Sequence, residues 1–236
     1  KSHIAFSLFG NDYTWATVIG GAIITIATAL VVIGGLKRIS KVAEKVVPVM
    51  AIIYVFLGVS VIIMNATRVP AAFALIFKGA FGVDTGVKAI AGAAAGTIIR
   101  MAMQKGIARG IFSNEAGLGS APIAAAAAKS DSAVKQGLIS MTGTVIDTLI
   151  ICTMTGLSIV LTGAYKVDGL EGAAVTNYAF QQGLPLPAGV SSFILMICLI
   201  FFAFTTILGW DYYGERCLEY VATGNKKAVT VYRWLY

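Results

Sequence analysis

Long stretches without charged residues constrain this chain more than any other feature. Two of them, 13–36 and 46–65, contain no charge at all, and each is long enough to cross about 30 Å of hydrocarbon as a helix. Two further stretches, 136–163 and 190–213, hold one charge each. Charged residues make up only 12% of the chain, against roughly 25% in soluble domains. The sequence therefore predicts an all-α polytopic membrane protein.

A fifth span, 99–128, is predicted to be broken near 112–119. The sequence GIFSNEAGLGSAP places glycines, Asn114, Glu115 and a proline between apolar flanks. A helix in hydrocarbon satisfies its own backbone groups, so a break is tolerated only around a cavity, water or a ligand. Secondary transporters use such breaks as binding sites. We therefore predict a broken helix that holds a polar site. A soluble loop with a helix after it is the alternative.

The remaining segments connect these spans within a single transmembrane domain. Residues 68–82 are too short to span the membrane, and their cations bracket an apolar face, which indicates a helix lying at the interface. Residues 164–189 form a long loop that is expected to carry a short helix of its own. Another apolar run starts at about 228.

The distribution of basic residues predicts the sides of the membrane. Nine Lys and Arg residues fall in the segments 37–46, 129–135 and 214–228, against five in the alternate segments 1–12, 66–88 and 164–189. The positive-inside rule therefore makes the first three segments cytoplasmic loops of a multi-pass cell-membrane protein. The basic residues form no stripe interleaved with aromatics, so no nucleic-acid partner is expected.

The residue inventory disfavours an enzyme or a metal centre. His3 is the only histidine, and the three cysteines have no metal-binding spacing. A membrane-embedded enzyme would need Glu115 and Asp147 as an acid–base pair or Ser113 as a nucleophile, and no histidine or convincing Ser–Lys spacing supports either. We therefore predict no enzymatic activity and no organic cofactor.

The broken segment also carries a family resemblance. KGIAR followed by GIFSNEAGLGSAP, together with VIDTLIICTMTG on the next span, resembles the sodium:alanine/glycine symporter family, also called alanine or glycine:cation symporters. The resemblance implies an inverted-repeat bundle of the leucine-transporter type, whose first and sixth helices are broken. It also implies that this chain is an internal fragment, from just before the fourth helix to the start of the ninth. Such a fragment lacks the N-terminal helices of the same protein and is not expected to transport alone.

Residues at the break are the first candidates for substrate binding. Freed backbone groups near Ser113 and Asn114 can meet the amino or carboxylate end of a small amino acid, while Phe112 covers its side chain. Gly117, like Gly110 and Gly119, permits an unwound backbone. Core packing for Phe112 and the glycines, and a helix cap for Asn114, are the alternatives.

The resemblance adds candidates from the span 190–213. In the family it corresponds to the eighth core helix, in which positions matching Thr206 and Trp210 line the substrate pocket. Thr205, on an adjoining face, is a candidate sodium ligand. The alternative is an interfacial tryptophan with threonines bonded back to their own helix.

Charged residues inside the spans are costly and need a partner. For Glu115 the nearest candidate is Arg109, which suggests a structural ion pair or a gate in preference to direct ion ligation. Asp147 either tunes ion coupling or hydrogen-bonds an unwound segment and only holds the fold.

The sequence thus predicts sodium-coupled symport of a small neutral amino acid, alanine or glycine, by alternating access. A pocket built from a glycine-rich break, a Phe and a Trp leaves little volume, which suits these two substrates. Sodium is the expected coupling ion. Coupling to a proton, with Glu115 or Asp147 titrating, and a passive channel or facilitator are the alternatives.

Overall fold

The structure, a computed structural model, describes residues 4–8, 11–80, 93–115 and 117–236. The chain folds into two compact units, one made of residues 1–50 and 200–236 and the other of residues 51–199. The chain passes between them inside two long helices. Parts of several expected segments lie outside the described residues: 1–3 and 9–10 of the segment 1–12, 81–82 of the interface helix, 81–88 of the segment 66–88, 87–92 before the broken span, and 116 within the predicted break.

The unit formed by the two ends of the chain begins with an unexpected small hairpin. Strands β1 (Ile4–Leu8) and β2 (Asn11–Thr14) pair in antiparallel register. Helix α1 (Trp15–Val32) follows and ends before a glycine pair, of which Gly35 has a φ of +66°. The unit is completed by the first part of α2 (Leu36–Met64), the second part of α9 (Ala188–Val221) and α10 (Lys226–Leu235). Its apolar core joins Val32, Ile39 and Leu208.

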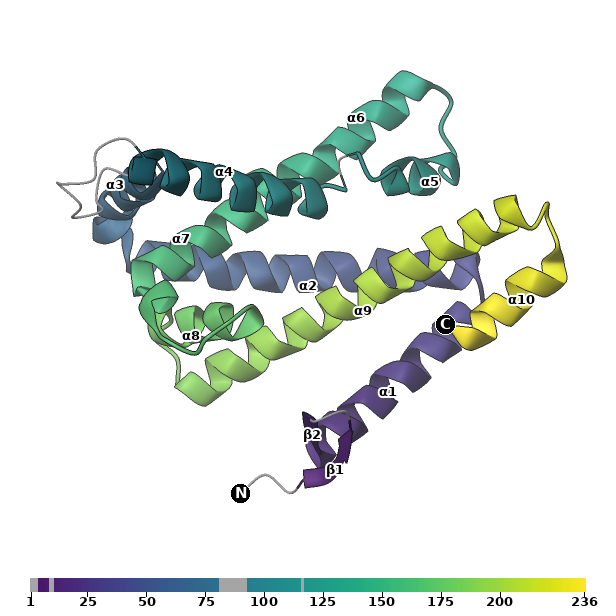
Figure 1. Ribbon diagram of the computed structural model, residues 1–236, viewed down its shortest axis with the longest axis horizontal. Coiled ribbons are helices and arrows are strands. Elements are labelled where there is room, and N and C mark those ends of the chain that lie inside the picture. Colours follow the sequence, from purple (N-terminus) through teal and green to yellow (C-terminus); the bar gives the residue numbers. More distant parts are fainter. Residues whose placement is uncertain (1–3, 9–10, 81–92, 116) are drawn as a thin grey trace. The chain divides into compact units, whose positions relative to one another are not determined.

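The unit formed by residues 51–199 holds the remaining helices, which Figure 1 shows in chain order. Its elements are the rest of α2, η1 (Ala66–Arg68), α3 (Val69–Ala80), α4 (Ala93–Ser113), α5 (Ser120–Ala126), α6 (Ala133–Thr144), η2 (Val145–Cys152), α7 (Thr153–Thr162), η3 (Ala164–Lys166), α8 (Ala173–Gly183) and the start of α9. Helix α8 is the short helix expected inside the loop 164–189. Helix α3 covers most of the segment expected at the membrane interface.

Tight packing of α2, α3, α7 and α8 forms the core of this unit. Ala72, Leu157 and Leu161 make one buried cluster. Gly58 allows α2 to approach α7, because a Cβ added there would collide with the side chain of Met154. The hydroxyl groups of Tyr54 and Thr155 lie 2.8 Å apart, and the Tyr54 ring packs on Phe180.

Two of the basic segments expected as cytoplasmic loops are largely helical, which corrects that prediction. Residues 37–46 form the start of α2, and residues 214–221 extend α9 to Val221 before a four-residue turn leads into α10. Neither 36–47 nor 215–221 contains glycine or proline, so nothing local stops the helix. The third segment, 129–135, does contain the connection between α5 and α6.

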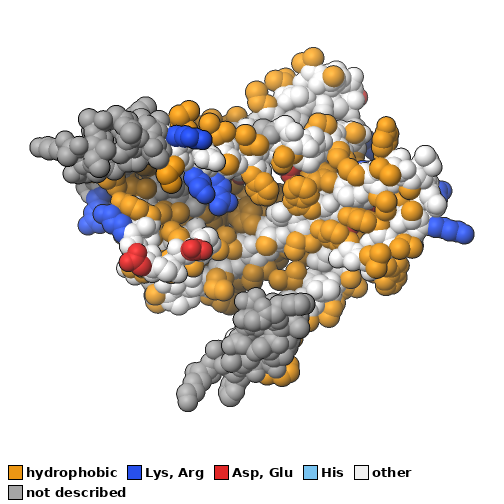
Figure 2. Space-filling model, viewed as in Figure 1, with side chains coloured by type: hydrophobic (Ala, Val, Ile, Leu, Met, Phe, Trp, Pro, Cys, Tyr) orange, Lys and Arg blue, Asp and Glu red, His pale blue; other side chains and the backbone are white. Residues whose placement is uncertain are grey.

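Three of the described helical rods are long and apolar enough to cross a membrane: Leu36–Met64, Ala133–Thr162 and Ala188–Val221. Helix α1 is a shorter apolar helix. Figure 2 shows hydrophobic side chains spread over the visible face of the described helices. Residues such as Ile52, Phe56 and Phe193 are largely exposed, which suits contact with lipid or with other membrane helices.

Candidate functional site

The predicted helix break is present. Helix α4 ends at Ser113 and α5 begins at Ser120, and between them Glu115, Gly117 and Gly119 all have positive φ angles of 53°, 78° and 78°. Glycine adopts this left-handed geometry freely, whereas Glu115 adopts it at a cost. The local sequence therefore explains why a regular helix cannot continue here.

The break leaves backbone groups available at the end of α4. The amides of Asn114, Glu115 and Leu118 close tight turns onto Gly110, Phe112 and Glu115. Among the described residues, no backbone hydrogen bond reaches the carbonyl oxygens of Ser113 or Asn114. The C-terminal end of a helix carries partial negative charge, so these oxygens are suited to a cation or an ammonium group.

The continuous helix Ala133–Thr162 runs beside the break, and its central part is a π-helix. Element η2, Val145–Cys152, joins α6 to α7 without interruption (Figure 1). A π-helical stretch inside an α-helix is rare and is frequent at functional sites. The sequence offered no signal for it, because its apolar composition also fits an α-helix.

Two side chains of η2 hold the end of α4. Ser113 Oγ donates a hydrogen bond of 2.5 Å to Asp147 Oδ2. Thr148 Oγ1 donates at 2.9 Å to Asn114 Oδ1, while Asn114 Nδ2 donates at 3.0 Å to the Gly110 carbonyl. The structure thus brings together three residues predicted separately, Ser113, Asn114 and Asp147, and adds Thr148.

Glu115 interacts across the break instead of with the predicted cation. Its carboxylate accepts a 2.6 Å hydrogen bond from Ser120 Oγ at the start of α5. Within the described part of the chain, no ion pair joins Arg109 to Glu115, and Arg109 is exposed on α4. A spacing of six residues does not place two side chains on one face of a helix, and the left-handed Glu115 bonds instead with Ser120 at the start of α5. Phe112, in the last turn of α4, has 65% of its surface exposed.

The other predicted site residues belong to the unit formed by the chain ends. Thr205 Oγ1 donates to the carbonyls of Phe201 and Phe202, and Thr206 Oγ1 donates to that of Phe202 at 2.8 Å. Trp210 packs edge-on against Tyr213. Both threonines therefore bond back to their own helix, the alternative that the sequence had left open, although their oxygen lone pairs stay available. The binding roles of Thr205, Thr206 and Trp210 stay predictions.

A buried cluster of charges, which the sequence analysis missed, lies in the same unit. Glu215 is 1% exposed and accepts hydrogen bonds from Arg233 Nε at 2.5 Å and Arg233 Nη2 at 2.8 Å. Arg216 also pairs with Glu215 and with Glu219. One turn before Glu215, Asp211 is fully buried. The four-residue spacing of two acids, Asp211 and Glu215, on an apolar helix is the signal in the sequence that points to this cluster.

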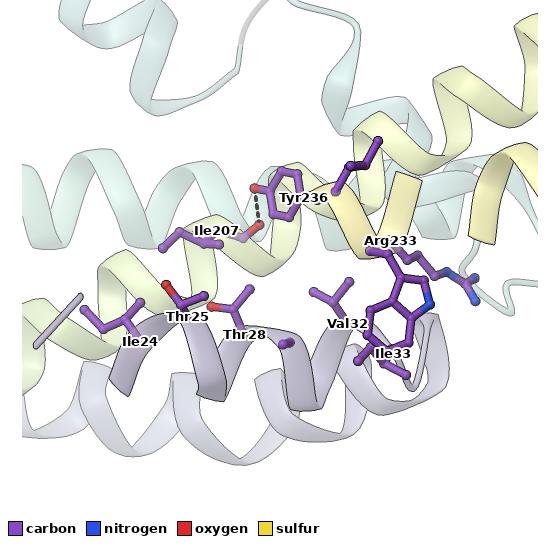
Figure 3. Close-up of a pocket in the computed structure, with 11 residues that line it drawn as sticks. Ile24, Thr25, Thr28, Val32, Ile33, Ile207, Arg233 and Tyr236 are labelled. Atoms are coloured by element: carbon purple, nitrogen blue, oxygen red, sulfur yellow. Dashed lines mark hydrogen bonds between the residues drawn. The ribbon is translucent and has the colours of Figure 1, made fainter. Parts of the chain in front are cut away.

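A cavity of about 480 Å³ lies between α1, α9 and α10 in this unit. Figure 3 shows Thr25 and Thr28 of α1 on one side and Tyr236 on the other, with the Arg233 guanidinium extending away from the two threonines. Tyr236 Oη donates at 3.0 Å to the Ile207 carbonyl. The lining is mainly apolar, with Ile24, Val32 and Ile33 contributing from α1.

Comparison with known proteins identifies relatives along the whole chain. Residues 1–236 match the family model described as the sodium:alanine symporter family. An uncharacterized transporter of Haemophilus influenzae is 50% identical over 96% of this chain and 48% of its own length. A sodium/alanine symporter of Methanococcus maripaludis is 42% identical over 96% of this chain and 47% of its own. A probable sodium/glutamine symporter of Bacillus subtilis is 40% identical over 99% of this chain and 46% of its own length. The chain spans about half the length of these relatives.

Proposed function

Because this chain belongs to the sodium:alanine symporter family, we propose that the full-length protein is a secondary active transporter. It couples sodium entry to the uptake of a small neutral amino acid, alanine or glycine, by alternating access. The observation that carries this proposal is the helix break between Ser113 and Ser120, held by Asp147 and Thr148 of a π-helix. Transporters bind solutes and ions at such interruptions.

The substrate is proposed to bind at the end of α4. The side chains of Ser113 and Asn114 are already bonded to η2. Their backbone carbonyl oxygens are therefore the groups proposed to accept hydrogen bonds from the ammonium group of the substrate. Phe112 is proposed to cover its small side chain, and Thr206 and Trp210 are proposed as substrate-binding residues from the family resemblance. Gly117 keeps the backbone open, because its φ of 78° suits no residue better than glycine.

Sodium is proposed to bind with Thr205 as one ligand. The Thr205 hydroxyl donates its proton to its own helix, which leaves oxygen lone pairs for a hard cation. Asp147 adds negative charge near the break and couples the ion to the substrate. Glu115 acts as a gating residue through its bond to Ser120, and Arg109, exposed on α4, is its alternative partner when the break rearranges.

The setting follows from the same proposal. The protein is a multi-pass protein of the cell membrane, and the missing N-terminal helices of the full-length protein contribute to the same bundle, which is of the leucine-transporter type. The segments 37–46, 129–135 and 214–228 face the cytoplasm. The first and third of these segments consist mostly of helix ends. The lipid bilayer and the amino acid are the expected partners, and neither a nucleic acid nor an enzymatic reaction is expected.

The direct test is uptake of labelled alanine and glycine by the full-length protein in vesicles. An inward sodium gradient should drive accumulation above the external concentration, and replacing sodium by choline should abolish it. Accumulation driven only by a proton gradient would show that the coupling ion is a proton and not sodium. Equilibration without accumulation would identify a passive facilitator and contradict symport. Labelled glutamine serves as the competing substrate, since one relative is named a glutamine symporter.

A further inference from the structure

Asp211 is a fully buried carboxyl group without a partner. Its side chain is 0% exposed within α9, and neither of its oxygens has a hydrogen-bond partner among the described residues. An ionised carboxylate in such a place loses its hydration and gains no hydrogen bond from the described residues in return. Ionisable residues inside membrane helices are rare, and they usually mark a functional site.

The groups around Asp211 are already committed to Glu215. On α9 itself, Glu215 lies one turn away and forms ion pairs with both Arg233 and Arg216. From α10, Tyr232 and Tyr236 also interact electrostatically with Asp211. Helices α1 and α2 face this part of α9 with the apolar cluster around Leu208. Arg38 of α2 is turned back to the Leu30 carbonyl of α1.

The charge balance of this cluster is uneven. Two guanidinium groups, those of Arg216 and Arg233, are bonded to the two carboxylates of Glu215 and Glu219. The cluster is therefore neutral without Asp211, and an ionised Asp211 would add one uncompensated negative charge to a buried site. It would also place two carboxylates one helical turn apart, which raises the energy of both.

We propose that Asp211 is a proton-binding site and is a neutral carboxylic acid in this conformation, while Glu215 is the ionised acid that holds α10 through Arg233. Loss of the proton would leave Asp211 and Glu215 competing for Arg233. The packing of α10 on α9 is therefore proton-dependent. Arg233 also packs beside Gly35 at the turn between α1 and α2, so a change in its pairing would change the contacts of that turn. This inference goes beyond the proposed symport and does not depend on the transported solute.

Infrared spectroscopy of the reconstituted full-length protein tests the protonation directly, because neutral and ionised carboxyl groups absorb at different frequencies. The wild type should have a carboxylic acid band that is lost in Asp211→Asn and retained in Glu171→Gln, a control at an exposed carboxylate outside the cluster. Labelling aspartate with carbon-13 should shift this band in the wild type, which keeps the test valid if the variant fails to fold. A band unaffected by both the substitution and the label would overturn the proposal.

Hydrogen exchange tests the consequence for α10. After correction for intrinsic rates, exchange of the α10 amides in the wild type should rise about tenfold per pH unit over a limited range. This range lies between the pH at which Asp211 ionises with α10 detached and the higher pH at which it ionises with α10 packed, because only there does detachment release one proton. This dependence should vanish in Asp211→Asn and persist in Glu171→Gln, whose exposed side chain lies outside the cluster. Equal dependence in all three proteins would overturn the proposal. Sodium-driven uptake by the same vesicles separates the two hypotheses, since symport without a protonated Asp211 would refute only this one.

Discussion

Two regions of the molecule place acidic side chains within apolar helices, and they do so in opposite ways. At the α4–η2 contact, Asp147 accepts from a neutral hydroxyl, that of Ser113, and is partly exposed. At the α9–α10 contact, Glu215 is buried and paired with two arginines. Single hydrogen bonds to neutral groups are readily exchanged for bonds to a ligand, whereas a buried ion pair resists opening. The first region is therefore suited to binding and the second to holding helices together.

The largest effect is expected from removing the buried acid, Glu215, because this tests whether the α9–α10 contact holds the helices together. Glu215→Ala should destabilise the full-length protein by about 3 kcal/mol, since it leaves Arg233 without its carboxylate and Arg216 with Glu219 alone. Thermal unfolding in detergent measures this. The exchanged pair Glu215→Arg with Arg233→Glu should recover part of the loss. A double variant no more stable than either single one would argue against a pairwise interaction.

The backbone at the break is the next most sensitive feature. Gly119→Ala should cost about 2 kcal/mol, because alanine is strained at a φ of 78°. Gly106→Ala is the matched control within α4, where an added Cβ meets nothing within 4 Å and alanine should add up to about 1 kcal/mol of stability. Unfolding midpoints of the two variants compare them. Equal effects would mean that residue 119 does not keep this left-handed geometry in the full-length protein.

The Ser113–Asp147 contact should matter more for transport than for stability. Ser113→Ala leaves Asp147 without its donor, and a loss of about 1.4 kcal/mol would lower sodium-driven uptake about tenfold. Ser113→Thr keeps a hydroxyl and should retain most activity. Initial rates of labelled alanine uptake provide the measurement. Full activity in Ser113→Ala would remove this contact from the proposed mechanism.

The smallest expected effect belongs to Thr148. Thr148→Val has nearly the same shape but cannot donate to Asn114 Oδ1, so we expect KM for alanine to rise about fivefold, the equivalent of roughly 1 kcal/mol. Thr148→Ser should restore the wild-type value. A lower maximal rate at unchanged KM would assign Thr148 to conformational change instead of substrate positioning.

The sequence predicted the helix break well and the basic segments poorly. The break follows largely from local chemistry, because Gly117 and Gly119 adopt the left-handed geometry that ends a helix. A proline alone is not enough, since α2 continues through Pro48. Charge density indicates the side of the membrane and says little about where a helix ends. Residues 37–46 and most of 214–228 were therefore expected as loops, although their residues favour helix.

The partners of the polar side chains could not be predicted in the same way. Glu115 was expected to meet Arg109, six residues earlier, but the left-handed turn directs it to Ser120. The π-helix depends on a shift of backbone bonding by one residue, and the apolar sequence VIDTLIIC is equally compatible with an α-helix.

The sequence alone determined that this chain is mainly helical, apolar enough for a membrane and broken near 112–119, because backbone geometry and transfer from water depend on nearby residues. Only the tertiary structure decided that Asp147 meets Ser113, that Arg233 pairs with Glu215 and that Asp211 has no hydrogen-bond partner among the described residues. These contacts join residues on separate helices. Their partners are therefore set by how the helices pack, which no local pattern specifies.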